Sequence, residues 1–135
     1  MTSEAGFPIP VADRDSAPFW DAAARGELRV QVCTGCRHGV FPPLPGRCPA
    51  CRSPLEWQAA SPAATVYSWI GVEHPIHEWE AALVPYAVVL AQLDDLPDVR
   101  IPCLYPGSAT DLSLGAAGEV VFSHDFGPGT RPLFR

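Results

Sequence analysis

The sequence contains no lysine, so all nine basic residues are arginine, and they stand against 15 acidic residues for a net charge of −6. Affinity for a phosphate backbone comes mostly from a dense basic surface that releases counterions. Because this chain is acidic on balance, its composition argues against a nucleic-acid partner. Any anionic ligand must instead be held locally by a few arginines.

Long apolar runs are also lacking. A membrane-spanning helix needs about 18 or more apolar residues in a row, and no stretch of this sequence reaches that length. The N-terminal stretch has neither the basic start nor the apolar run of a secretory signal. We therefore expect a soluble, cytoplasmic protein without a membrane partner.

The motifs of common active sites are absent as well. The sequence has no glycine-rich phosphate loop, no nucleophile elbow and no Ser-His-Asp pattern. Aldol or Claisen chemistry needs a nucleophile or a placed base together with an oxyanion site, and no convincing set of either is present. We predict no catalytic residues, and we expect the chain not to be an enzyme by itself.

Proline, by contrast, is abundant, with 16 residues in a chain of 135. This content predicts a mainly β fold with many turns and short strands rather than long helices. The length suits one domain, or a small metal-binding segment beside one compact unit. We divide the chain into an extended arm at 1–14, a helix with the cysteine segment at 15–60, and a β-rich unit with a C-terminal tail at 61–135.

One short amphipathic helix is predicted after the arm. Ser16 can cap its start, Pro18 suits its first turn, and apolar residues recur near helical spacing up to Gly26. The aromatic pair Phe19 and Trp20 needs a surface to cover. That surface is either the neighbouring cysteine segment or another subunit.

Four β-like runs follow, separated by Pro, Gly and Asp turns, and they span 65–74, 85–95, 99–105 and 118–126. They predict a small antiparallel barrel or sandwich. In the first run, alternation places Tyr67 and Trp69 on one face. Val66, Ser68 and Ile70 then occupy the other face.

Four of the five cysteines form two C-x2-C pairs separated by eleven residues, Cys33 with Cys36 and Cys48 with Cys51. Each pair can present two thiolates about 2.3 Å from one metal ion in a tetrahedral site. The segment between the pairs is too rich in proline and glycine to build a core. The metal would therefore supply most of the local order, as in small zinc modules where binding is worth roughly 10–16 kcal/mol. We predict one zinc ion per chain.

A redox pair and a pair of disulfides are the alternatives for these cysteines. Two tandem C-x-x-C motifs in a cytosolic chain favour zinc over both. Four thiolates close the coordination shell and leave no position for water or substrate, so the zinc is predicted to be structural. The fifth cysteine, Cys103, is interpreted as a reduced core residue.

Two further groups of residues carry weaker signals. His74, His77, Glu78 and Glu80 cluster after the first β-like run and could suggest a second metal site or an acid and base pair, but a polar loop is the favoured interpretation because no further ligands with a telling spacing are present. At the C-terminus, Arg131 and Arg135 flank Leu133 and Phe134. This segment either contacts a partner or an anionic ligand, or forms a final barrel strand.

The motifs together resemble the DUF35 family over roughly residues 16–125. The resemblance rests on the four cysteines, the Pro-Phe-Trp of the helix, the proline-rich loop between the cysteine pairs, and Pro85 with Tyr86. It implies a leading helix, a rubredoxin-like zinc ribbon and a five-stranded OB-fold barrel. Members of the family are small partners of thiolase-superfamily enzymes, among them acyltransferases and aldolases that shorten steroid side chains.

The hypothesis that follows is a noncatalytic subunit that docks on a thiolase-like enzyme and helps bind or channel an acyl-CoA thioester. The predicted partner contacts are large or basic side chains of the helix and the C-terminus, namely Phe19, Trp20, Arg131, Leu133, Phe134 and Arg135. The alternative is an OB-fold module for single-stranded nucleic acid, in which Tyr67 and Trp69 stack bases from one strand face.

Overall fold

The computed structural model describes residues 8–126 and 129–135. The elements, in chain order, are α1 (Ala17–Ala24), β1 (Arg29–Cys33), β2 (Gly39–Val40), β3 (Leu55–Ala59), β4 (Ala63–Val72), the 3-10 helix η1 (Glu78–Ala82), β5 (Tyr86–Leu93), β6 (Arg100–Tyr105), the 3-10 helix η2 (Ala109–Asp111), β7 (Ala117–Ser123) and β8 (Arg131–Phe134). The predicted mainly β class is confirmed. Of the predicted arm, residues 1–7 lie outside the described residues, and 8–13 form no helix or strand. No helix in the described ranges is long and apolar enough to cross a membrane.

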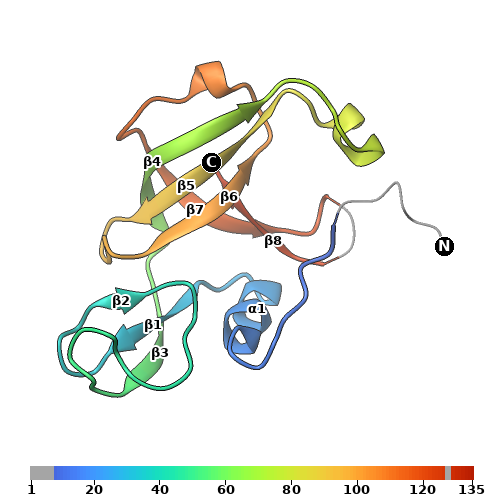
Figure 1. The fold of residues 1–135 in the computed structure, drawn as a ribbon. Helices are drawn as coiled ribbons and strands as arrows, with labels where there is room; N and C mark the ends of the chain where they lie inside the picture. The colour runs from blue at the N-terminus through green and yellow to red at the C-terminus, as the bar shows by residue number, and fades with distance from the viewer. Residues whose placement is uncertain (1–7, 127–128) are drawn as a thin grey trace.

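The cysteine segment forms a three-stranded antiparallel sheet in the order β2-β1-β3. Strand β1 is central and pairs with β3 over five residues, from Arg29 opposite Ala59 to Cys33 opposite Leu55. The loops at the cysteine end of this sheet are longer than β2, and Figure 1 shows them as wide turns below the barrel. We call this sheet and its loops the ribbon.

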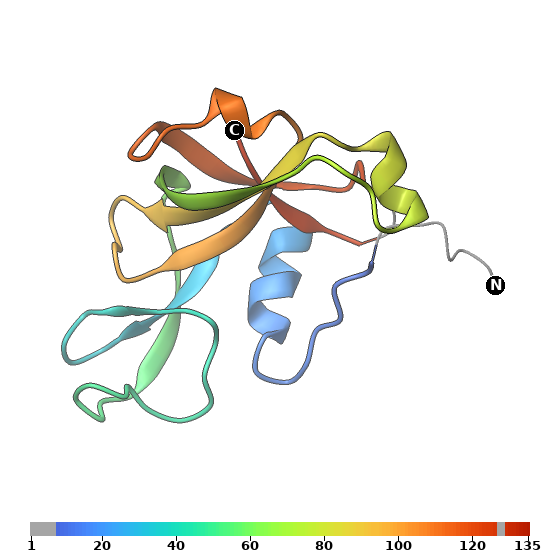
Figure 2. The same cartoon turned by 45° about the horizontal axis from the view of Figure 1, so that its top comes forward.

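The second sheet is a closed barrel with the strand order β4-β5-β6-β8-β7. Strands β4, β5 and β6 form an antiparallel meander, β7 returns to pair with β4, and β8 closes the barrel by running parallel to β6. This is the five-stranded OB-fold topology that the resemblance implies. Figure 2 shows the barrel strands wrapping around one another while α1 lies beneath them.

A β-bulge in β4 corrects one sequence prediction. The register with β5 shifts between Val66 and Ser68, so Tyr67 is an extra residue and both Tyr67 and Ser68 are exposed. After the bulge, Trp69 turns inward against the core while Ile70 is 64% exposed. A bulge inserts one residue and thereby reverses the facing of those that follow. The prediction that Tyr67 and Trp69 share a face is wrong, and with it the stacking surface of the nucleic-acid alternative.

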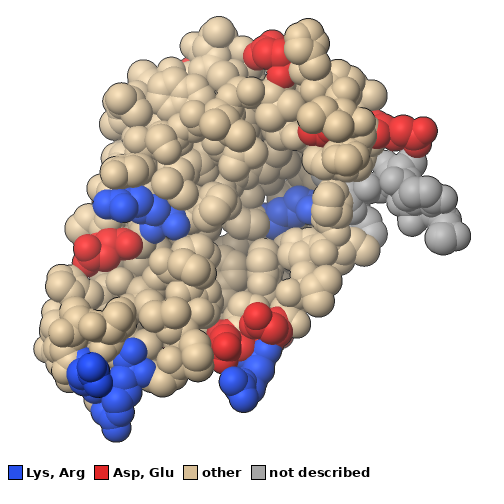
Figure 3. Space-filling view, in the orientation of Figure 1, with Lys and Arg blue, Asp and Glu red and all other residues tan. Residues whose placement is uncertain are grey.

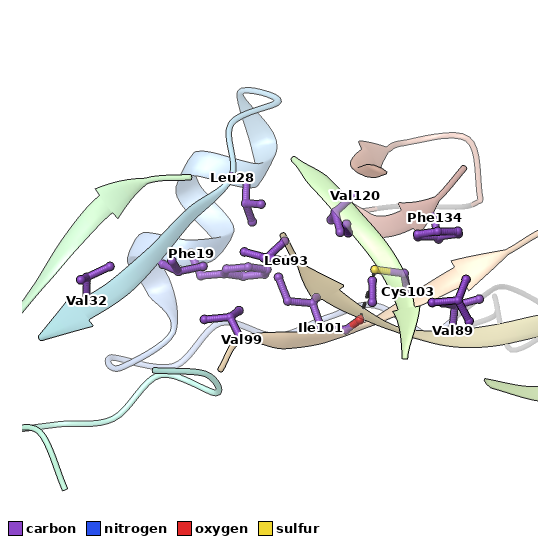
Figure 4. Packing of buried hydrophobic residues seen from close by; sticks show 14 residues of the cluster. Phe19, Leu28, Val32, Val89, Leu93, Val99, Ile101, Cys103, Val120 and Phe134 are labelled. Carbon is purple, nitrogen blue, oxygen red and sulfur yellow. Dashed lines mark hydrogen bonds between the residues drawn. The ribbon is translucent and has the colours of Figure 1, made fainter. Parts of the chain in front are cut away.

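One hydrophobic cluster joins the helix, the ribbon and the barrel. Phe19 of α1 is 3% exposed, and its ring lies 5.4 Å from that of Phe41 in the ribbon and 5.8 Å from that of Phe122 on β7. Figure 4 shows Phe19 beside Leu93, between ribbon and barrel side chains. Because all three parts share this cluster, the predicted boundary between residues 60 and 61 stays a prediction.

Candidate metal centre and partner surfaces

The four predicted ligands converge at the end of the ribbon. The sulfur atoms of Cys33, Cys36, Cys48 and Cys51 all lie within 4.8 Å of one another. The Sγ atoms of Cys33 and Cys51 are 3.3 Å apart, and those of Cys36 and Cys48 are 3.7 Å apart. A tetrahedral Zn–S4 site with bonds of about 2.3 Å requires sulfur separations of about 3.8 Å. The donor set and its spacing therefore fit one structural zinc ion.

Two matching backbone turns hold these sulfurs. In the first, the Arg37 amide donates to the Cys33 carbonyl, and in the second the Arg52 amide donates to the Cys48 carbonyl. Amides inside the turns point at the first sulfur of each pair, with Gly35 donating to Cys33 Sγ at 3.3 Å. When bound, zinc would cross-link the two turns and, with four protein ligands, leave no site for substrate.

Each turn ends on an arginine in the left-handed conformation. The φ angles are +66° at Arg37 and +69° at Arg52, which makes them the two non-glycine residues with positive φ in the described ranges. Glycine adopts this conformation freely, whereas a residue with a Cβ atom pays roughly 1–2 kcal/mol. Glycine would therefore suit both positions better as far as the backbone is concerned.

Hydrogen bonds and burial set two cysteine pKa values. Side-chain and backbone hydrogen bonds from Ser53 lower the pKa of the Cys51 thiol to about 6, so a thiolate is available at neutral pH. Cys103, in contrast, is 1% exposed inside the barrel, where burial raises its pKa to about 12. The interpretation of Cys103 as a buried, free core residue is confirmed.

Contacts between the ribbon and the loop that follows β5 fix the metal site relative to the barrel. The His38 ring lies 3.4 Å from Cys36 Sγ through Nδ1 and 3.6 Å from the Asp98 carboxylate through Nε2. On the next residue, a Cβ atom added to Gly39 would stand 2.5 Å from a methyl carbon of Val99 and 3.4 Å from Leu96. The ribbon backbone therefore approaches the barrel so closely at Gly39 that a residue with a Cβ atom would not fit without a shift.

The histidine and glutamate cluster forms a braced loop. Glu80 is 6% exposed and accepts hydrogen bonds from the Ile76 and His77 amides, each 2.8 Å, and from the Tyr86 hydroxyl at 2.7 Å. The amide bonds, led by that of His77, and the Tyr86 bond lower the pKa of Glu80. Within the described residues, the four cysteines are the only group placed to hold a metal, so the second metal site has no support.

Three of the six predicted partner contacts are used inside the molecule. Phe19 and Phe134 are 3% and 4% exposed, because α1 packs against the barrel and the C-terminal segment is strand β8. Arg131 donates to the Pro8 and Phe126 carbonyls and thereby holds the N-terminal segment on the barrel. The premise that these side chains are exposed is wrong for Phe19 and Phe134.

The other three predicted contacts remain at the surface. Trp20 is half-buried with its ring 5.0 Å from that of Phe19, Leu133 is half-buried on β8, and Arg135 is exposed and forms an ion pair with Glu119 at 3.0 Å. Their role in binding a partner stays a prediction.

The barrel also carries an apolar surface that strand periodicity alone does not reveal. Strand pairing places five outward-facing residues side by side across all five strands, in the order Ile70, Val88, Leu104, Leu133 and Val121. None of them is buried. We call this set the outer row. A second row beside it contains Leu90 and the exposed Pro102. The bulge in β4 places Ile70 in this row, which the alternation of the sequence could not predict.

Comparisons with known proteins agree with this geometry. The family described as "ChsH2, rubredoxin-like zinc ribbon domain" matches residues 20–57. A solved chain of the "Ltp2-ChsH2(DUF35) aldolase" matches with 29% identity and a TM-score of 0.78, over 93% of this chain and 97% of that one. These matches confirm the resemblance to the DUF35 family.

A curated relative extends beyond this chain. The "Probable enoyl-CoA hydratase alpha subunit" of Thermomonospora curvata is 38% identical over 90 residues, which are 65% of this chain. The matched part is only 27% of that relative's length.

Proposed function

We propose that this chain is a noncatalytic accessory subunit that docks on a thiolase-like enzyme. One observation carries the proposal, which is the likeness over nearly the whole of both chains to the DUF35 chain of the Ltp2-ChsH2(DUF35) aldolase. An identity of 29% over nearly the whole of both chains indicates more than a shared barrel fold. The partner class comes from that likeness and from the resemblance found in the sequence.

The outer row supports docking through the barrel. Ile70 is 64% exposed, and the neighbouring outward residues on β5 and β6 are apolar. Contiguous exposed apolar surface is typical of protein interfaces, whose centres are depleted of charge. Because the complete row runs around the closed barrel, we propose that its members on the adjacent strands β4, β5 and β6, namely Ile70, Val88 and Leu104, form the centre of the contact with the thiolase-like subunit.

The finer part of the proposal concerns the ligand. The complex acts on an acyl-CoA thioester, which the accessory subunit helps to bind or channel while the reacting groups sit on the partner. A closed Zn–S4 shell gives the ribbon a structural role in this arrangement. We propose the cytoplasm as the location, because acyl-CoA esters are substrates of cytoplasmic enzymes.

Co-purification tests the proposal. The tagged chain is expressed with a thiolase-like protein from the same genome, and the complex and each subunit alone are assayed against a panel of acyl-CoA esters that includes steroid side chains. We expect a stable complex, turnover by the complex, and none by the isolated chain. Failure to associate with any thiolase-like protein at micromolar concentration, or submicromolar, salt-sensitive binding of an oligonucleotide, would overturn it.

A matched pair of variants locates the contact. Ile70→Lys places a charge in the outer row, and Leu114→Lys makes the same change at a 71% exposed leucine outside it. Central interface residues commonly cost 1–2 kcal/mol or more when disrupted. We therefore expect Ile70→Lys to weaken binding about tenfold or more, and Leu114→Lys to leave it unchanged. Equal effects of the two would exclude the outer row.

A further inference from the structure

Three arginines lie beside the cysteine pairs at the end of the ribbon. Arg37 and Arg52 follow the second cysteine of each pair, and Arg47 precedes the second pair; all three are exposed. Arg47 Nη1 donates to the Arg52 carbonyl at 3.1 Å, which holds the Arg47 side chain at the turn that carries Arg52. We call this set the arginine tip.

Arg37 and Arg52 both adopt a backbone conformation that is unfavourable for arginine. The positive φ angles at Arg37 and Arg52 favour glycine, yet the chain has arginine at both. An unfavourable conformation that persists at two equivalent positions indicates that the side chains serve a purpose beyond folding.

The arginine tip is also uncompensated. In the part of the chain that the structure describes, the ion pairs of arginine involve Arg14, Arg25 and Arg135, and none involves the arginine tip. Three of the nine basic residues therefore gather at one end of a chain whose net charge is −6. Figure 3 shows basic side chains at the ribbon end with no acidic side chain beside them.

From this arrangement we propose that the arginine tip is a second docking site, which binds an acidic surface of the thiolase-like subunit. The inference rests on the proposed function for the identity of the partner. Guanidinium groups pair with carboxylates through two parallel hydrogen bonds, so an acidic protein surface is complementary to the tip in both charge and geometry. The apolar outer row would supply contact area, and the arginine tip would supply orientation and rate of association.

An acidic protein surface fits these observations better than a phosphate ligand or a nucleic acid. The three side chains project from two exposed turns at the end of the ribbon rather than lining a concave pocket, whereas small-molecule sites are concave. Binding of a nucleic acid would have to overcome the net negative charge of the rest of the chain.

The competing explanation is that the arginines neutralise the negative charge of the zinc site. A zinc ion with four thiolates carries two negative charges, and nearby arginines would offset them. This explanation predicts that removal of the arginines weakens metal binding, while the docking explanation predicts that only association with the partner changes. The two can be separated on the same variants.

Association kinetics with the thiolase-like subunit test the proposal. We compare Arg37→Gln/Arg52→Gln with Arg14→Gln/Arg25→Gln, which changes the net charge equally but at the exposed arginines near α1. Neutralising interface charges acts mainly on the association rate. At about 50 mM salt we expect the tip variant to associate about 5- to 30-fold more slowly, with the difference largely gone near 0.5 M salt. The control variant should match the wild type.

Glycine variants separate docking from folding. Arg37→Gly/Arg52→Gly relieves the backbone conformation, so we expect a melting temperature equal to or above that of the wild type and one zinc ion per chain. Association should nevertheless slow as in the glutamine variant. Loss of zinc or of thermal stability in this variant would assign the arginines to the metal site and overturn the proposal.

The remaining outcomes are also decisive. If the wild type binds the thiolase-like subunit and the tip variants associate equally fast, the arginine tip is not a docking site, while the proposed function stands. If free CoA at millimolar concentration protects the tip of the isolated chain from arginine-directed modification, the site is for phosphate and the inference is wrong. If the wild type binds no thiolase-like subunit, the proposed function is wrong, and the arginine tip does not bind such a subunit either.

Discussion

The ribbon and the barrel are both built on β-sheets, but different interactions hold them together. The ribbon has three short strands and long loops that bury little apart from β1 and two cysteines. The barrel closes five strands around fully buried side chains such as Val89, Leu93 and Ile101. In the ribbon, metal ligation therefore supplies the stability that a hydrophobic core would otherwise give. In the barrel, the burial of apolar side chains supplies it. Because one hydrophobic cluster also joins the two parts, the variants below test how far each part can be perturbed alone.

Loss of zinc should have the largest effect. Cys33→Ser or Cys51→Ser removes one of four ligands, and metal binding in small zinc modules is worth roughly 10–16 kcal/mol. We expect zinc content near zero and rapid proteolysis between residues 34 and 54, with the barrel still folded. Elemental analysis and limited proteolysis measure both. Cys103→Ser is the control, since this thiol lies in the barrel, and it should keep one zinc ion; unaltered folding of both ligand variants would contradict the metal assignment.

A cavity in the barrel should have the next largest effect. Leu93 is 1% exposed, and Leu→Ala in a core typically costs 2–5 kcal/mol. We expect Leu93→Ala to lower the free energy of unfolding by about that amount in urea titrations while the folded protein keeps its zinc. Leu114→Ala, at an exposed leucine, should change stability by less than about 0.5 kcal/mol. Loss of zinc from folded Leu93→Ala protein would show that the halves are not separable.

Gly39→Ala tests the contact between the halves. The added methyl group would meet Val99 at 2.5 Å, and overpacking of this kind typically costs 1–3 kcal/mol. We expect a loss of stability of about that size with both zinc and barrel retained. Gly46→Ser serves as the comparison, because a Cβ atom there meets nothing within 4 Å and the cost is only that of its positive φ. If Gly39→Ala is the milder of the two, the close approach is unimportant.

Glu80→Gln should have the smallest effect, and it depends on pH. Hydrogen bonds hold the folded pKa of Glu80 below its ordinary value of 4.5, so its ionised form stabilises the fold above that pH. This stability is lost as the pH falls through the lower folded pKa. We therefore expect the variant to melt below the wild type at pH 7 and the two melting temperatures to converge in acid. A constant difference across the range would contradict the role of the carboxylate.

The sequence predicts the metal site better than it predicts the surfaces. The spacing of the cysteines determines which atoms meet, because each C-x2-C pair forms its own turn. The bulge at Tyr67 could not be predicted in this way, since both faces of β4 are apolar on either register. The burial of Phe19 depends on Phe41 and Phe122, which are distant in the sequence.

The arginine tip shows the same limit. Arg37 and Arg52 are conspicuous only when their φ angles are known, because arginine after a cysteine pair is unremarkable as a sequence. Strand β8 was one of two alternatives for the C-terminal segment, and its pairing with both β6 and β7 shows the strand, while contact of this segment with a partner stays a prediction. Local chemistry is thus readable from the sequence, whereas exposure and backbone conformation require the assembled fold.

The position of β8 also affects how the protein is made. This short strand lies between β6 and β7, so the barrel remains an open sheet with two unpaired edges until residues 131–134 leave the ribosome. At about 5–20 residues per second, the edges of β6 and β7 can meet other nascent chains before β8 separates them. Chaperone binding during synthesis, and aggregation when β8 is deleted, should therefore concentrate on these two strands.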